Sequence, residues 1–296
     1  MKQIILLLLL PSLLSAQQLP FQEIERQLIE LGHTLLSDTL PEQRIAAAEK
    51  IKITLTETLD QPGSFQYPFD SLTSVSILAP KDNSFRIFTW QLYQDIDQYK
   101  YFGIIQVAGK KPTVHILEDQ SETVALEDLP YEVLTKDAWY GALYYNIKEY
   151  KTKAGKRYLL FGADGYRFFS KRKLVDVLYF EKDQPIFGEA TFFPSEEDRP
   201  DLAYARLVLS YSAATSIRLN YDDYLNLLIF DNVLPANNEY GEETFLPDGS
   251  YRGYELKKGR WIAVEKIFQH TWDEAPRPQP ILNGRKQNKD LFGNED

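Results

Sequence analysis

Two stretches near the N-terminus place apolar residues at helical spacing. Between residues 21 and 36 the apolar positions fall three or four residues apart with charged residues between them, and a second run follows Pro41. This spacing puts the apolar side chains on one face of a helix. The apolar positions are Phe21, Ile24, Leu28, Leu31 and Leu35, then Ile45, Ala48, Ile51, Leu55 and Leu59. We therefore predict a helical hairpin over residues 17–63.

From residue 64 to residue 272 the pattern changes to short runs of aromatic and β-branched residues separated by turn residues. Short gaps favour antiparallel hairpins, because a parallel crossover needs a dozen or more residues. The predicted fold class is α+β and mainly β. The helical hairpin packs on a large antiparallel meander of about ten to fourteen strands, built as one curled sheet or two packed sheets.

Three other features divide the chain. Residues 118–136 are acidic and contain Pro130, so they are the candidate seam between two halves of the β-rich domain. Residues 273–296 have three prolines and few large apolar residues, which is typical of a flexible tail. Residues 151–156 and 257–260 each contain a glycine and predict hairpin tips, where glycine takes a positive φ.

Residues 1–16 have the pattern of a secretory signal peptide. Lys2 precedes an apolar run of roughly ten residues, and Ala16 offers a small residue for cleavage. A membrane-spanning helix needs about 20 apolar residues, so a permanent anchor is the weaker interpretation. We predict cleavage after Ala16, a periplasmic or secreted protein, and no transmembrane segment after cleavage.

Composition excludes several classes of function. The chain has no cysteine, which excludes disulfides, a thiolate metal site and the lipid-bearing cysteine of a lipoprotein. Acidic residues outnumber basic ones 43 to 33, giving a net charge of −10. Nucleic-acid binding depends on clustered positive charge, so we expect no nucleic-acid partner. An acidic surface indicates solubility and names no particular partner.

Local sequence patterns for catalysis or cofactor binding are missing. The chain contains no nucleophile elbow, phosphate-binding loop, dinucleotide-binding turn or zinc-binding helix motif. His33, His115 and His270 lie too far apart in sequence for a usual metal site. Oxygen-bearing residues between positions 231 and 248 can in principle bind calcium, but a solvated acidic loop is the preferred interpretation. We predict no catalytic residue, no metal site and no cofactor.

Aromatic residues provide the candidate for binding. The chain has 4 Trp, 19 Tyr and 17 Phe, and a strand cannot bury consecutive aromatics unless both of its faces are covered. Trp and Tyr combine an apolar face with a hydrogen-bonding edge, which suits sugars or peptides. The Asp164-Gly165 and Asp248-Gly249 pairs are first of all turn signals. We expect six residues to line a ligand groove: Trp139, Tyr140, Tyr144, Asp164, Tyr166 and Arg167.

Three groups of segments carry a family resemblance. They are residues 64–72 with 85–90 and 101–106, then Trp139-Tyr-Gly-Ala-Leu-Tyr-Tyr145 with 158–165, and finally Pro247-Asp-Gly-Ser-Tyr-Arg-Gly-Tyr254 with 258–261. In their order and spacing the chain resembles an uncharacterised family of exported proteins from bacteroidete-type Gram-negative bacteria. Ala163 departs from that pattern, which has a bulky aromatic before the Asp-Gly turn. The resemblance implies export and a single β-rich architecture, and it brings no activity with it.

The sequence favours an exported, soluble protein without catalysis, which acts as a binding protein or an envelope scaffold. Its expected partner is an unknown ligand or an envelope protein. No acid, base and nucleophile can be assembled from a local pattern. The alternative is a hydrolase acting on polysaccharide or peptide through carboxylates from distant strands, held roughly 5 to 10 Å apart with separated pKa values. A pocket holding two such carboxylates would favour the hydrolase, and an aromatic groove without them would favour binding. The sequence specifies no oligomeric state.

Overall fold

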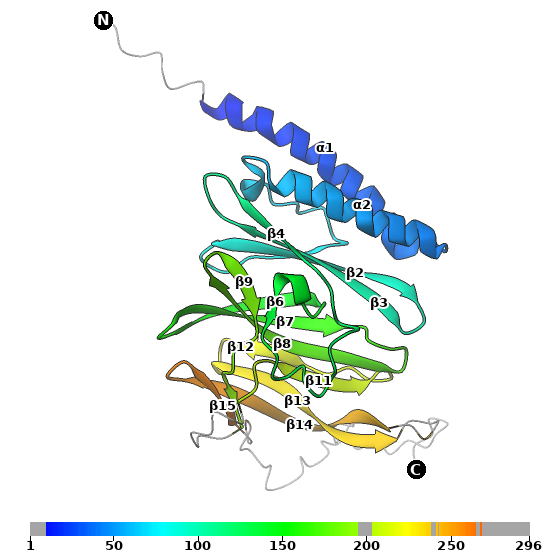
Figure 1. Cartoon of the computed structure of the whole chain (residues 1–296), viewed down its shortest axis with the longest axis vertical. Coiled ribbons are helices and arrows are strands. Elements are labelled where there is room, and N and C mark those ends of the chain that lie inside the picture. The colour runs from blue at the N-terminus through cyan, green and yellow to red at the C-terminus, as the bar shows by residue number, and fades with distance from the viewer. Residues whose placement is uncertain (1–9, 195–202, 238–240, 242, 265–266, 268–296) are drawn as a thin grey trace, which may run out of the picture.

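The computed structural model describes residues 10–194, 203–237, 241, 243–264 and 267, which fold into four stacked layers (Figure 1). A pair of helices forms the first layer, and the upper, middle and lower β-sheets follow it. The predicted fold class is confirmed, but the described residues form three sheets and fifteen strands, more than we expected. The ladders between strands are antiparallel, except that Phe192–Phe193 runs parallel to Trp261 and Ile262.

The elements have the following bounds. The first layer consists of α1 (Leu10–Ser37) and α2 (Pro41–Leu59), followed by a 3-10 turn, η1 (Ser64–Gln66). The upper sheet has the order β1 (Ser76–Leu78), β2 (Phe85–Asp95), β3 (Gln98–Val107) and β4 (Thr113–Leu117). The middle sheet has the order β5 (Leu134–Thr135), β9 (Gln184–Phe187), β8 (Ser170–Glu181), β7 (Gly155–Asp164) and β6 (Leu143–Thr152), with β11 (Leu207–Ser212) also paired to β8. The lower sheet has the order β10 (Phe192–Phe193), β15 (Arg260–Val264), β14 (Glu243–Lys257), β13 (Leu227–Asn237) and β12 (Leu219–Asp222).

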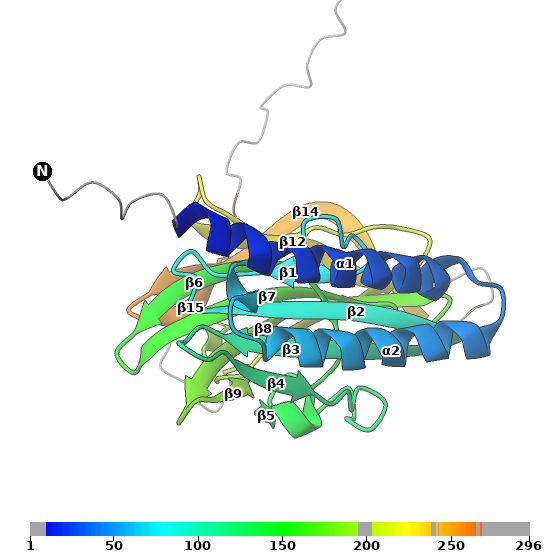
Figure 2. The ribbon, with the colours of Figure 1, turned by 90° about the horizontal axis from the view of Figure 1, so that it is seen from above.

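The helical hairpin covers the outer face of the upper sheet (Figure 2). Leu28 and Leu55 from the two helices are completely buried against Phe88, Trp90 and Ile104 of β2 and β3. Burying each of these side chains contributes about 1.5–3 kcal/mol relative to leaving it exposed. The helical spacing of the sequence therefore identifies the face that packs on the sheet, except at Ile45, which is 38% exposed.

The middle sheet is covered on both faces. Along β7, Leu160 packs toward the upper sheet, whereas Leu159 and Phe161 pack toward the lower sheet. Along β8, Leu174 and Val175 divide between the two cores in the same way. Because side chains alternate along a strand, only a doubly covered sheet buries consecutive apolar residues. This arrangement explains how the chain encloses its long aromatic runs.

A completely buried ion pair holds the 118–136 segment onto the middle sheet. Arg206 Nη2 lies 3.0 Å from Asp176 Oδ1, and both side chains have no exposed surface. The same guanidinium donates to the backbone carbonyls of Leu129 and Glu132, at 2.7 and 3.1 Å, and of Phe187 at 3.3 Å. The segment that we predicted as a seam thus connects β4 to β5 and is fixed by a buried cation.

The two predicted hairpin tips contain glycines in the left-handed region, as expected. Gly155 has φ +123° between β6 and β7, and Gly259 has φ +84° between β14 and β15. Of the predicted signal peptide, residues 1–9 lie outside the described residues, and α1 is described from Leu10. The predicted tail, 273–296, also lies outside them. Within the described ranges no helix has the length and apolar character that a membrane span requires.

Candidate functional site

A pocket of about 400 Å³ opens where connections from the upper and middle sheets meet. We call it the loop pocket. Its walls come from the β2–β3 turn, the segment after β4 and the β7–β8 connection, and the backbone N–H of Phe168 donates to Asp97, which ties two of these connections together. The lining residues are Asp97, Gln98, Tyr99, Tyr101, Ser121, Glu122, Val124, Leu126, Tyr140, Asp164, Tyr166, Arg167 and Arg172.

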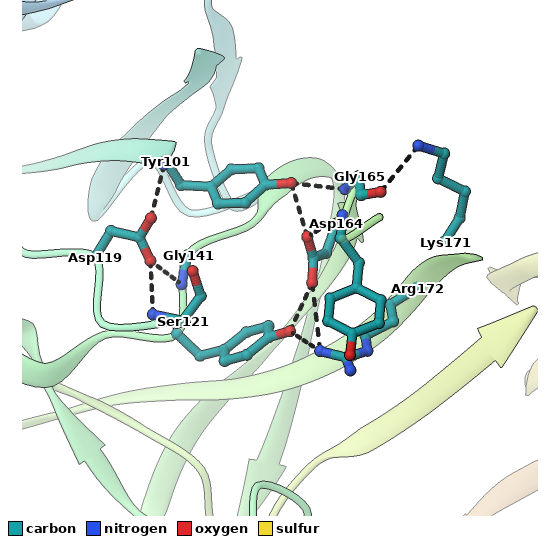
Figure 3. Close-up of polar contacts among 10 residues, drawn as sticks. Tyr101, Asp119, Ser121, Gly141, Asp164, Gly165, Lys171 and Arg172 are labelled. Carbon is teal, nitrogen blue, oxygen red and sulfur yellow. Dashed lines mark hydrogen bonds and ion pairs between the residues drawn. The ribbon is translucent and has the colours of Figure 1, made fainter. Parts of the chain in front are cut away.

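Asp164, at the end of β7, organises the buried floor of this pocket (Figure 3). Its Oδ1 accepts hydrogen bonds from the Tyr101 hydroxyl at 2.9 Å and from the Tyr166 backbone N–H at 2.8 Å. Its Oδ2 accepts a bond of 2.6 Å from the Tyr140 hydroxyl. Charge-assisted hydrogen bonds of this kind are among the strongest in proteins. The carboxylate therefore fixes two rings and one loop in place.

Arg172 balances the charge of Asp164. The two residues face each other across the β7–β8 ladder, with Arg172 Nη1 3.9 Å from Asp164 Oδ2 and 2.9 Å from the Tyr140 hydroxyl. The Arg172 Cζ lies 3.2 Å from the centre of the Tyr166 ring, which covers the guanidinium as a cation–π contact. Its Nε is buried and has no hydrogen-bond partner among the described residues.

Tyr166 adopts an unusual backbone conformation. Its φ is +45°, in the left-handed region that bulky residues rarely occupy, whereas we expected Gly165 to take that conformation. Gly165 is required at its position for a steric reason, because a Cβ there would lie 2.8 Å from the Tyr99 ring. Gly249 of the second Asp-Gly pair has φ +84°, but this pair lies within β14 and not in a turn between strands. Backbone strain of this type costs about 1–3 kcal/mol and clusters at ligand sites.

A second carboxylate, Asp119, supports the pocket from behind (Figure 3). It accepts backbone hydrogen bonds from Tyr101 at 2.7 Å, Ser121 at 2.9 Å and Gly141 at 3.1 Å. Burial raises its pKa above the usual range, and the three backbone N–H donors oppose that shift. Because these donors belong to three separate segments, Asp119 holds the walls of the loop pocket together.

Burial raises the pKa of Tyr101, Tyr140 and Tyr144 well above the ordinary value of 10.0. The negative charge of Asp164 adds to this shift for Tyr101 and Tyr140, and Asp176 does so for Tyr144. All three phenols must therefore stay protonated in the folded protein at a pH where the unfolded chain has already ionised.

The difference between the folded and unfolded pKa values of these phenols predicts that the protein loses stability at alkaline pH. Since the folded pKa values are raised, the three phenols contribute stability below about pH 10, and that contribution falls as the pH rises further. The free energy of unfolding should decrease by about 1.4 kcal/mol per pH unit for each phenol. Urea titrations at increasing pH, followed by phenolate absorbance, would measure it. Three phenols that ionise near pH 10 in a fully folded protein would contradict the prediction.

Four of the six predicted groove residues, Tyr140, Asp164, Tyr166 and Arg167, line the loop pocket. Trp139 and Tyr144 do not. They are completely buried in the core between the upper and middle sheets, where Trp139 Nε1 donates to the Tyr144 hydroxyl at 3.0 Å. The idea that they line a groove is wrong, because the middle sheet is covered on both faces.

Four residues that build the pocket were not predicted from the sequence: Tyr101, Asp119, Tyr99 and Arg172. Only Arg172 left a signal in the sequence. Arg172 lies between Lys171 and Lys173, whose side chains point to the opposite face of β8. Arg172 shares its own face with the buried Leu174 and therefore points inward. Tyr101 approaches Asp164 from another sheet, across 63 positions of sequence, and no local pattern indicates such a contact.

The histidines lie apart from one another. His33 is exposed on α1, His115 is buried in β4 with its pKa lowered by burial, and His270 lies outside the described residues. In the part of the chain that the structure describes, no three acidic or histidine side chains gather closely enough to hold a metal ion. The described flanks of the candidate calcium segment belong to β13 and β14, and residues 238–240 and 242 lie outside the described residues.

No protein-family model, curated protein or solved structure matches this chain.

Proposed function

We propose that this protein is an exported, non-catalytic binding protein that holds a carbohydrate in the loop pocket. The observation that carries the proposal is the engagement of both Asp164 oxygens by the Tyr101 and Tyr140 hydroxyls and the Tyr166 backbone N–H. These three hydrogen bonds make the Asp164 carboxylate part of the floor of the pocket. Its role is to hold aromatic rings in place around the cavity.

The lining of the pocket favours an uncharged, hydroxyl-rich ligand. Three acidic residues and two arginines border the cavity, so the formal charges nearly cancel. Gln98, Ser121 and Glu122 add donors and acceptors near the opening, and Tyr99 and Tyr166 add ring surfaces. Sugars use this combination, since their hydroxyls pair with polar groups and their C–H faces pack on aromatic rings. A volume of about 400 Å³ suits a small saccharide.

The hydrolase alternative receives no support from the described residues. Glycoside cleavage needs two carboxylates on either side of the bond, one of which takes up or gives a proton. Asp164 is engaged at both oxygens, and Asp119 lies outside the lining, bound to three backbone N–H groups. The other two acids, Asp97 and Glu122, are exposed at the rim.

Export belongs to the same proposal. The lysine at position 2, the apolar run and Ala16 support passage across the inner membrane, as does the resemblance to exported bacteroidete proteins. A periplasmic or secreted location would place the pocket where polysaccharide fragments from the environment or the envelope are encountered.

Calorimetric titration of the purified chain with a panel of short oligosaccharides, and with peptides of similar size, tests the proposal. We expect a saccharide to bind with one site per chain and to raise Tm. Arg167→Gln removes an exposed guanidinium at the rim and should weaken binding about tenfold, while Arg218→Gln, an exposed arginine outside the pocket, should leave it unchanged. Binding of peptides alone, or equal affinity in both variants, would refute the proposal.

A further inference from the structure

A second pocket lies at the open edge between the middle and lower sheets. It has a volume of about 310 Å³ and forms where β11 faces β13 and β14 (Figure 1). We call it the sandwich pocket. Its lining residues are Pro130, Tyr204, Arg206, Leu207, Val208, Leu209, Phe230, Arg252 and Tyr254.

The apolar walls of the sandwich pocket continue the core between the two sheets. Leu207, Leu209 and Phe230 belong to that core, and the Phe230 ring stacks on the Tyr254 ring with centres 6.1 Å apart. The pocket is therefore a gap in the packing of two sheets, lined by aromatic and aliphatic side chains. An alkyl chain or an aromatic ring would extend the core into this gap.

The charge in the sandwich pocket is positive. No aspartate or glutamate contributes to the lining, whereas two arginines do. Arg206 is neutralised by its buried pair with Asp176. Arg252 is exposed on β14 and forms no ion pair with the residues that the structure describes. Arg252 thus adds an exposed guanidinium to a cavity whose other walls are mainly aliphatic and aromatic.

Tyr254 places an unused hydroxyl at the same position. Its side chain is only 7% exposed, and its hydroxyl has no hydrogen-bond partner in the described part of the chain. Burial and the neighbouring Tyr204 raise the pKa of Tyr254 to about 12, and Arg252 opposes the shift. Arg252 and Tyr254 both line this pocket. A carboxylate would accept hydrogen bonds from the guanidinium and from the Tyr254 hydroxyl.

We propose that the sandwich pocket binds an apolar monocarboxylate, with its hydrocarbon part between the sheets and its carboxylate on Arg252 and the Tyr254 hydroxyl. This site is separate from the loop pocket, and the two share no lining residue. The inference therefore does not depend on the proposed carbohydrate function, and either can fail without the other.

Calorimetric titration with decanoate, and with decanol as the uncharged match, tests this inference. We expect decanoate to bind one site and decanol to bind at least about tenfold more weakly. Arg252→Gln should weaken decanoate binding at least about tenfold without changing decanol binding, and Tyr254→Phe about threefold or more. Arg218→Gln, which changes an exposed arginine outside both pockets, is the matched control and should bind decanoate as wild type does. The inference is overturned if decanoate does not bind, if decanol binds equally well, or if Arg252→Gln binds decanoate unchanged.

Discussion

Replacing Arg206 with methionine is expected to lower the free energy of unfolding by about 3–5 kcal/mol, because it leaves the Asp176 carboxylate buried without its cation. Three backbone carbonyls, from Leu129, Glu132 and Phe187, also lose their donor. Methionine fills much of the volume, so the loss is electrostatic and does not arise from a large cavity.

Urea unfolding of the variant, followed by circular dichroism, measures the change. Arg218→Met is the matched control, since Arg218 is half exposed and its bond to Asp222 is a surface contact. Exposed pairs contribute little, so the control should unfold near the wild-type midpoint. If Arg206→Met proved as stable as the control, the buried ion pair would not hold the 118–136 segment in place.

Replacing Asp164 with alanine is expected to cost about 3 kcal/mol or more and to abolish binding in the loop pocket. The substitution leaves the Tyr101 hydroxyl and the Tyr166 backbone N–H without their acceptor, and Arg172 without its countercharge. Tyr166 has a positive φ that this acceptor helps to maintain, so the ring over Arg172 should lose its fixed position. Stability and binding are therefore expected to fall together.

Two comparisons separate this positioning role from a direct contact with ligand. Asp164→Asn keeps the shape and one acceptor oxygen, so it should recover part of the stability and part of the affinity. Asp223→Ala removes an exposed aspartate on the lower sheet and should change neither. Asp164→Ala with full affinity for the saccharide would show that the buried network does not organise the pocket.

The sequence predicts those parts of the fold that local periodicity controls. Leu28 and Leu55 reveal a helix face through their spacing, and Gly155 marks a hairpin tip because it accepts a positive φ. Each of these outcomes depends on neighbours within a few residues. The helical hairpin and the mainly antiparallel strands could therefore be predicted from local patterns.

The number of layers could not be predicted in this way. Whether a strand such as β7 is covered on one face or two depends on a sheet whose strands all come later in the chain, between Phe192 and Val264. Trp139 and Tyr144 were assigned to a groove for this reason, and they are core residues. Tyr140 and Asp164 line the loop pocket because they lie where strands end and loops begin.

The partners of Asp164 could not be predicted either. Tyr101 reaches it from the upper sheet, and Arg172 reaches it across a ladder whose register is set by the whole hairpin. An inward-pointing charge on an apolar strand face, as at Arg172, is the one signal that sequence reasoning can use for such a site. Asp176 follows the same rule four residues later, and it too has a buried partner.

The fate of a bound oligosaccharide tests the central claim most directly. The protein would be incubated with an excess of the saccharide that it binds, and the sugar would be followed by mass spectrometry and by reducing-end assay. We predict that the saccharide is recovered intact at every time point, that wild type binds it in the loop pocket, and that Arg167→Gln binds it about tenfold more weakly. Cleavage products that accumulate beyond the amount of protein present would contradict the account.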